Sequence, residues 1–159
     1  MEAYQGDRTP VPKGSGLLRA SVRRPPYGKR VPRAKALKVR VPDRPGILGE
    51  VASALGANGI NLVAVHGYSE KGQGLLCLVV DKLAAAVKVL KGRGLDPQED
   101  DILEVQLADR PGTMGEVAKT LGDAGINIKY VFVGTARGRK VTVYLAVEDL
   151  AGAVKTLRG

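Results

Sequence analysis

Two stretches of the chain alternate apolar and polar residues, and a helical apolar pattern follows each of them. The alternating stretches are residues 37–41 and 103–107, and their period of two is that of a half-buried β-strand. Apolar residues then recur at helical spacing over residues 48–55 and 114–121. The pattern therefore predicts a strand followed by an amphipathic helix, twice.

The same turn joins strand to helix in both places. Its sequence is Asp-Arg-Pro-Gly, which occurs first at positions 43–46 and again at positions 109–112. Each predicted helix is followed by Gly-Ile-Asn and an apolar residue, at 59–62 and 125–128. A chain that repeats itself this closely consists of two copies of one structural unit.

Each unit continues with two predicted strands, joined by a loop that contains glycine, and with a second helix. These elements are expected at 60–68, 75–80 and 83–90 in the first unit, and at 126–134, 141–147 and 150–157 in the second. The order strand–helix–strand–strand–helix is that of the ferredoxin-like fold, an antiparallel sheet with helices on one face. We expect the fold class α+β, with two βαββα(β) units paired side by side.

The expected boundaries are 36–95 for the first unit, 96–101 for a linker and 102–159 for the second unit, which has no room for a fourth strand. This leaves an open edge beside residues 103–107. Residues 1–35 carry nine Lys or Arg against two acidic residues, and five of the nine prolines. We expect a basic, mostly disordered tail, whose apolar residues 17–22 are a candidate for covering the open edge, as is another chain.

The repeated turn is a candidate anion site. Its proline suits a helix start, and we expect the aspartate just upstream to cap the helix. The glycine has no Cβ, so a ligand can approach the backbone, and the first amides of a helix lack intrahelical partners. These features favour a carboxylate or phosphate. A turn that only connects strand to helix has the same features, so both readings stay open here.

The turn, the helix behind it and the strand opened by Gly-Ile-Asn together resemble the ACT domain, over residues 37–95 and 103–158. This resemblance implies a regulatory module that senses amino acids. It also implies ferredoxin-like units that pair through edge strands, and an effector held between the turn of one unit and the second strand of its partner.

Carried over by position, the resemblance implies two ligand sites. One is lined by Asp43, Arg44, Gly46, Ile47 and Leu48 with Asn127 and Ile128, and the other by Asp109, Arg110, Gly112, Thr113 and Met114 with Asn61 and Leu62. Backbone N–H groups of the turns would hold the ligand carboxylate, and an aspartate or asparagine oxygen would accept from its ammonium group. Because the apolar residues of the two turns differ, the two sites need not share a ligand or an affinity.

An alternative is a regulatory small subunit that docks on an amino-acid biosynthetic enzyme such as acetolactate synthase. Leu75, Cys77 and Val79 should face away from the helices of the first unit, yet they are apolar. Strands apolar on both faces are usually covered on both. We therefore expect a homodimer or an enzyme partner against this open face.

Binding of RNA is disfavoured. An RNA-recognition module with this topology needs aromatic residues on its open sheet face. Tyr130 and Phe132 share a face with Ile128, so we expect them under the helices. The basic tail is then the feature left to bind nucleic acid.

Catalysis, cofactors and metal binding are not expected. No serine, cysteine and histidine combination matches a catalytic motif, and one histidine with one cysteine cannot build a zinc site. We expect His66 to be a packed core residue and Cys77 to be buried and inert. The chain has no apolar run long enough to span a membrane and no apolar signal core, so we expect a cytoplasmic protein without a membrane partner.

Overall fold

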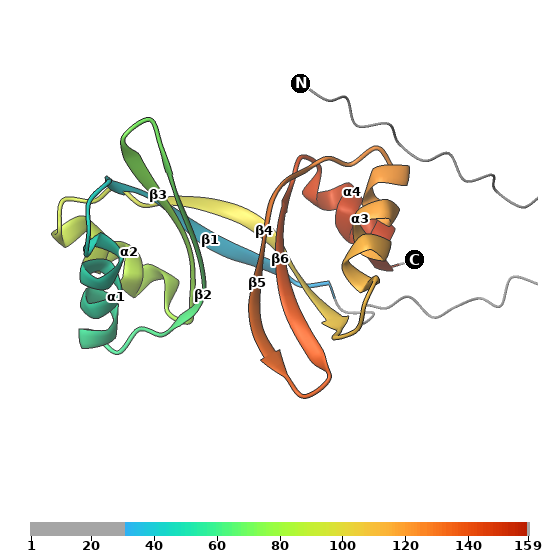
Figure 1. Cartoon of the computed structure of the whole chain (residues 1–159), viewed down its shortest axis with the longest axis horizontal. Coiled ribbons are helices and arrows are strands. Elements are labelled where there is room, and N and C mark those ends of the chain that lie inside the picture. The colour runs from blue at the N-terminus through green and yellow to red at the C-terminus, as the bar shows by residue number, and fades with distance from the viewer. Residues whose placement is uncertain (1–30, 159) are drawn as a thin grey trace, which may run out of the picture.

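A computed structural model describes residues 31–158, which form two α+β units on one six-stranded antiparallel sheet of order β2-β3-β1-β4-β6-β5 (Figure 1). The expected α+β class and the ferredoxin-like units are confirmed. The elements are β1 (Arg33–Pro42), α1 (Ile47–Ala57), β2 (Leu62–Glu70), β3 (Gln73–Val80), α2 (Leu83–Gly92), β4 (Gln98–Ala108), α3 (Thr113–Asp123), β5 (Ile128–Arg137), β6 (Lys140–Val147) and α4 (Leu150–Arg158).

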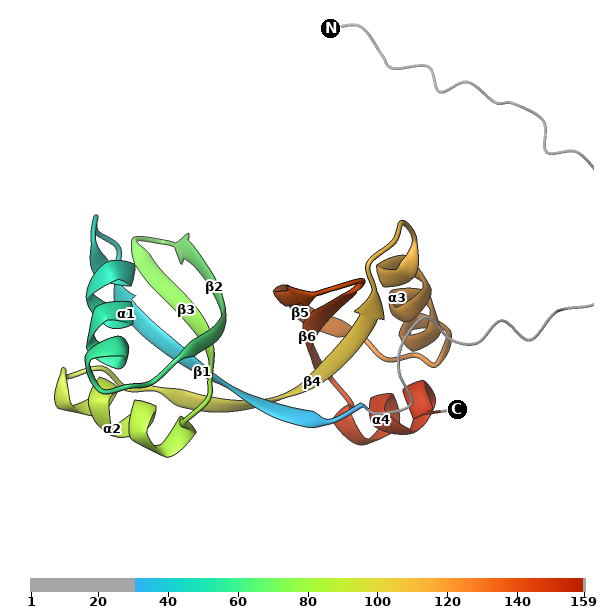
Figure 2. The same cartoon turned by 90° about the horizontal axis from the view of Figure 1, so that it is seen from below.

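Each unit has its own core between sheet and helices. Alternate residues of β1, such as Leu37 and Val39, pack with Leu55 of α1 and Leu90 of α2. The second unit repeats this with β4, α3 and α4. The two helix pairs lie on the outer sides of the molecule, and the sheet bends so that its uncovered faces turn toward each other (Figure 2).

The two units exchange their fourth strands. β1 pairs with β3 over residues 37–42 and with β4 over residues 33–38. β4 in turn pairs with β1 over residues 98–103 and with β6 over residues 103–108. The first half of β4 is thus the fourth strand of the first unit, and the first half of β1 is that of the second.

This exchange supplies the strand that the second unit lacks. Residues 33–35, which we assigned to the tail, begin β1, and residues 98–101 of the expected linker begin β4. Just before β1, Val31 is buried in the second core, and Pro32 O accepts from Glu104 N at 3.0 Å. The segment 17–22, our candidate for the edge, lies outside the described residues.

A third apolar cluster forms where the two open faces meet. It joins Cys77 and Val79 of the first unit to Phe132 and Tyr144 of the second. Cys77 and Val79 of the open face are therefore covered within the chain and no longer argue for an external partner, whereas Leu75 stays half-buried outside the cluster. Cys77 is buried, as expected, and desolvation raises the pKa of its thiol.

Our expectation that Tyr130 and Phe132 lie under the helices is wrong. The register of β5 shifts between Ile128 and Tyr130, which turns both rings to the opposite face. Phe132 stacks on Tyr144 with ring centroids 5.4 Å apart and on half-buried His66 of the first unit at 6.1 Å. The aromatic face that an RNA-binding module needs is present, but the first unit closes it.

Candidate functional site

Both helices that follow the repeated turns begin on a left-handed glycine. Gly46 has φ 87° and is the N-cap of α1, and Gly112 has φ 90° and is the N-cap of α3. Within the described residues neither helix has a side-chain cap hydrogen bond, so our expectation that the aspartates cap them is wrong. The aspartates stand three residues before the glycines, outside the capping position.

The turns leave backbone donors free. The first helical hydrogen bonds run from Glu50 N to Gly46 O and from Glu116 N to Gly112 O, each at 3.0 Å. Within residues 31–158, the N–H groups of Gly46, Leu48 and Gly49 have no backbone acceptor, and they lie in an exposed turn. Free amides at the positive end of a helix dipole favour an anion.

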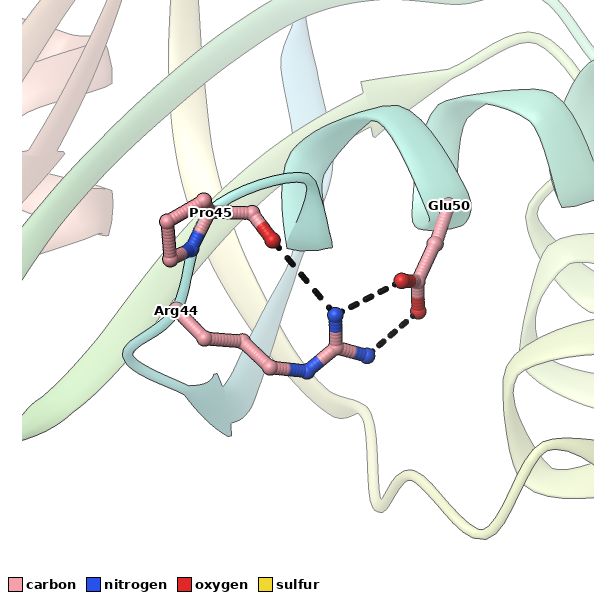
Figure 3. Close-up of polar contacts among 3 residues, drawn as sticks. All are labelled: Arg44, Pro45 and Glu50. Carbon is pink, nitrogen blue, oxygen red and sulfur yellow. Dashed lines mark hydrogen bonds and ion pairs between the residues drawn. The ribbon is translucent and has the colours of Figure 1, made fainter.

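Arg44 is committed to Glu50 in a bidentate pair (Figure 3). Its Nη1 donates to Glu50 Oε1 at 2.7 Å and its Nη2 to Oε2 at 2.6 Å, while Nη1 also reaches Pro45 O at 3.5 Å. The hydrogen bonds from Arg44 hold the pKa of Glu50 below its usual value. The guanidinium thus braces the turn against the first turn of the helix.

The second turn is held in another way. Arg110 makes a single contact with Glu116 at 3.6 Å, instead of two short ones. Thr113 is only 5% exposed, and its hydroxyl donates to Ala108 O at 2.9 Å and to Arg110 O at 3.2 Å. The first turn has Ile47 at this position, so a buried threonine takes over part of the bracing that Arg44 provides there.

The two aspartates also differ. Asp43 Oδ1 accepts from the Ser69 hydroxyl at 2.7 Å. The residue of the second unit that corresponds to Ser69 is Ala136, because its hairpin is one residue longer. Asp109 is tied to the β5–β6 hairpin only by its backbone, whose N–H donates to Arg139 O at 2.9 Å. Its carboxylate makes no hydrogen bond or ion pair within the described residues.

Comparison with known families fits this geometry. The ACT domain model matches residues 35–87 and 102–158, which together are more than half of the chain. The chain belongs to the ACT domain family. A comparison with curated protein sequences found no match.

Solved structures share the tandem arrangement. Protein BT0572 from Bacteroides thetaiotaomicron is 23% identical, with 80% of this chain and 88% of that chain covered and a TM-score of 0.75. The ligand-free regulatory subunit of aspartate kinase from Thermus thermophilus is 19% identical, with 82% and 94% covered and a TM-score of 0.62. At this identity the likeness concerns the fold.

In the structure the residues of each turn lie together. The two halves of each expected site, a turn and an asparagine strand, do not meet. Residues 43–48 and 109–114 form two separate turns at opposite ends of the molecule (Figure 2). No hydrogen bond or ion pair within residues 31–158 joins the first turn to Asn127 and Ile128, or the second turn to Asn61 and Leu62.

The two asparagines are exposed at the starts of the sheet's edge strands. Asn61 N donates to Asp81 Oδ1 at 2.9 Å, and Asn127 Nδ2 donates to Glu148 Oε1 at 3.3 Å. Each amide oxygen therefore stays available to a ligand, because neither of these bonds uses it.

Sequence reasoning missed three residues around the first turn, namely Glu50, Ser69 and Arg93. A hollow of about 170 Å³ beside it is lined by Arg44, Ile47 and Glu50 together with Arg93 at the end of α2. Glu50 and Glu116 stand at the same position of the repeat, which could have marked them. Ser69 and Arg93 are not repeated in the second unit, so no such signal marks them.

Other site classes receive no support from the described part of the ACT chain. Within residues 31–158, no group of three His, Cys, Asp or Glu side chains is arranged to hold a metal ion. No helix in that range is both long and apolar enough to cross a membrane.

Proposed function

We propose that this protein is a non-catalytic regulator that binds a free amino acid at its Asp-Arg-Pro-Gly turns. One observation carries the proposal. Within residues 31–158, each turn presents backbone amides without an acceptor at a helix N-terminus, beside an exposed aspartate, Asp43 or Asp109. The amides suit a carboxylate and the aspartate suits an ammonium group, so an α-amino acid meets both.

A second copy of the chain completes each site. Within one copy the turns do not meet the asparagines of the other unit, whereas β2 and β5, which begin beside those asparagines, are the free edges of the sheet. Val65, Val131 and Val133 on these edges are 41%, 41% and 62% exposed. Pairing of β2 with β5 of a second copy covers both edges and valines.

Within the described residues, the charged side chains of the second turn make fewer contacts than those of the first. Arg44 already gives its guanidinium to Glu50, and Asp43 already accepts from Ser69. Arg110 has one long contact, and the Asp109 carboxylate has none within the described residues. We expect the second turn to bind the ligand first.

Ligand binding would favour the assembled copies over separate ones by mass action, and a partner protein could read that change. The likeness to a regulatory subunit of aspartate kinase supports a regulatory role of this kind. It also favours a second candidate, docking on an amino-acid biosynthetic enzyme, which predicts co-purification with a catalytic chain. A single buried cysteine fits the cytoplasm as its compartment.

Calorimetry against each of the twenty amino acids tests the proposal. We expect one amino acid to bind, and the Asp109→Asn variant to weaken it roughly tenfold or more, since a hydrogen bond between charged groups contributes about 1.5–3 kcal/mol. Asp123→Asn, on the same unit but in an ion pair with Lys119, is the matched control and should bind normally. Lack of heat with all twenty amino acids would remove the proposal.

A further inference from the structure

The first unit has a groove beside β1 that the turns do not account for. β1 loses its β4 neighbour after the pair Lys38–Gln98, but its pairing with β3 continues to Pro42. The chain before β4 is held away by the end of α2, where Gly94 N donates to Lys91 O at 2.9 Å. A groove of about 640 Å³ opens between β1 and this segment.

The groove combines cations with apolar walls. Lys38 and Arg40 of β1 lie on one side, Leu75 of β3 and Leu95 supply apolar surface, and Gln98 closes the end beside Asp96. Among the described residues of the lining, the only carboxylate is partly used, because Asp96 Oδ2 accepts from Gln98 Nε2 at 2.8 Å. The lining therefore holds two cations and one carboxylate.

Arg40 is the cation with capacity for a ligand. Lys38 is already neutralised by Asp100, with Nζ to Oδ2 at 2.6 Å, and its ammonium also lies over the Tyr130 ring at 4.8 Å. Arg40 donates once within the described residues, from Nη1 to Gln73 Oε1 at 3.2 Å. A guanidinium has five donors, and its fork matches the two oxygens of a carboxylate.

The second unit has lost these features. A smaller hollow of about 240 Å³ in the second unit shares three positions of the groove, and Glu104 and Gln106 stand there where the first unit has Lys38 and Arg40. The hairpin of the second unit is one residue longer, so the residue numbers of its third strand are shifted by one further position. Thr142 therefore stands at the position of Leu75. A cation on the first strand and the apolar wall of Leu75 are thus specific to the first unit, whereas the cation beside the smaller hollow, Arg137, comes from β5.

We infer that this groove is a separate binding site for a small organic carboxylate with an apolar chain. The carboxylate pairs with Arg40, and the chain lies on Leu75 and Leu95. Unlike the turns, the groove asks for no ammonium group. The inference does not depend on the proposed amino-acid sites, because it uses none of their residues.

Titration of the full chain with 4-methylpentanoate, followed by amide NMR shifts and calorimetry, tests this. We expect saturable shifts at Gly94, Leu95, Asp96, Gln98 and Arg40, with no such shifts for the uncharged 4-methylpentanamide. Arg40→Gln and Leu75→Thr introduce the residues that the second unit has at these positions. The first should weaken binding roughly tenfold and the second several-fold. Both residues are at least partly exposed, so both variants should keep the wild-type spectrum elsewhere.

Arg137→Gln is the matched control, because Arg137 is an exposed arginine that lines the smaller hollow of the second unit. It should leave the affinity unchanged. The inference is overturned if 4-methylpentanoate does not bind, if it shifts residues 43–48 or 109–114 instead of 94–98, or if Arg40→Gln and Arg137→Gln weaken it equally.

Discussion

Lys35 and Asp101 occupy the same position in the two repeats, as Asp43 and Asp109 do, and they pair with each other. They face each other in the β1–β4 ladder, and Lys35 Nζ lies 3.2 Å from Asp101 Oδ1. A residue that contacts its own equivalent lies on a twofold axis. The two ACT units are therefore joined as a symmetric dimer of one unit would be, with a lysine and an aspartate where identical residues would repel or stack.

This exchange predicts that the two units unfold together. Leu37 and Leu103 are equivalent, fully buried, and flank the shared ladder. Leu37→Ala and Leu103→Ala should each destabilise the whole chain by about 2–5 kcal/mol. Urea unfolding followed by circular dichroism should show one transition in both variants. Two transitions, of which each variant moves only one, would mean that the units are independent.

The contact between the open faces should matter for stability as well. Phe132 is 6% exposed and stacks on rings from both units, whereas its neighbour Val133 is 62% exposed. We expect Phe132→Ala to cost about 3–5 kcal/mol and Val133→Ala to stay within about 0.5 kcal/mol. Chemical denaturation of the two variants measures this. Similar losses for both would show that the faces do not pack.

Much of this fold follows from the sequence, because its signals are local. The alternation at 37–41 and 103–107 and the helical spacing behind it give strand and helix directly, and the Asp-Arg-Pro-Gly repeat gives the symmetry. The buried state of Cys77 also followed from an apolar strand.

The remainder depends on partners that no local pattern names. Residues 98–101 are all polar, with no apolar alternation to reveal that this segment pairs with 35–38, so a linker was expected where β4 begins. One bulge after Ile128 reversed the face of Phe132. At the turns, the hydrogen bond from Ser69 to Asp43 joins residues far apart in the chain, and only the folded hairpin brings the two together.

Acid should weaken the contact between the units through Asp100. Burial opposes ionisation of this carboxyl, but hydrogen bonds from Lys38 and from the Tyr130 hydroxyl at 2.7 Å outweigh it and hold its pKa below the usual value. A depressed folded-state pKa stabilises the fold above the unfolded pKa of about 3.9, and this contribution is lost as the pH falls further.

Asp100→Asn should therefore lose stability at pH 7 and flatten the decline below about pH 4. Asp101→Asn, which removes an exposed carboxylate from the other face of the same strand, controls for the change in net charge. Urea midpoints at several pH values provide the comparison. An unchanged acid slope in Asp100→Asn would contradict the assignment.

The left-handed turns predict opposite effects at two glycines three residues apart. A Cβ at Gly112 or Gly115 meets no atom of the described residues within 4 Å, so space does not distinguish them. Gly112 has φ 90°, where a side chain costs about 1–2 kcal/mol, whereas Gly115 lies inside α3, where alanine gains about 0.5–1 kcal/mol. Thermal unfolding should show Gly112→Ala below and Gly115→Ala above the wild type. A shift of the same sign in both would refute the turn geometry.

The central claim is that a metabolite binds between the turn of one copy and the asparagine strand of another, and mixing two defective chains tests it most directly. One chain carries Asp43→Asn and Asp109→Asn, and the other carries Asn61→Ala and Asn127→Ala. Each should bind the amino acid roughly tenfold or more weakly on its own. In mixed dimers, intact turns of one chain meet intact asparagines of the other, so calorimetry of the mixture should recover binding. A mixture that binds as weakly as its components, with dimers present, would contradict a site shared between copies.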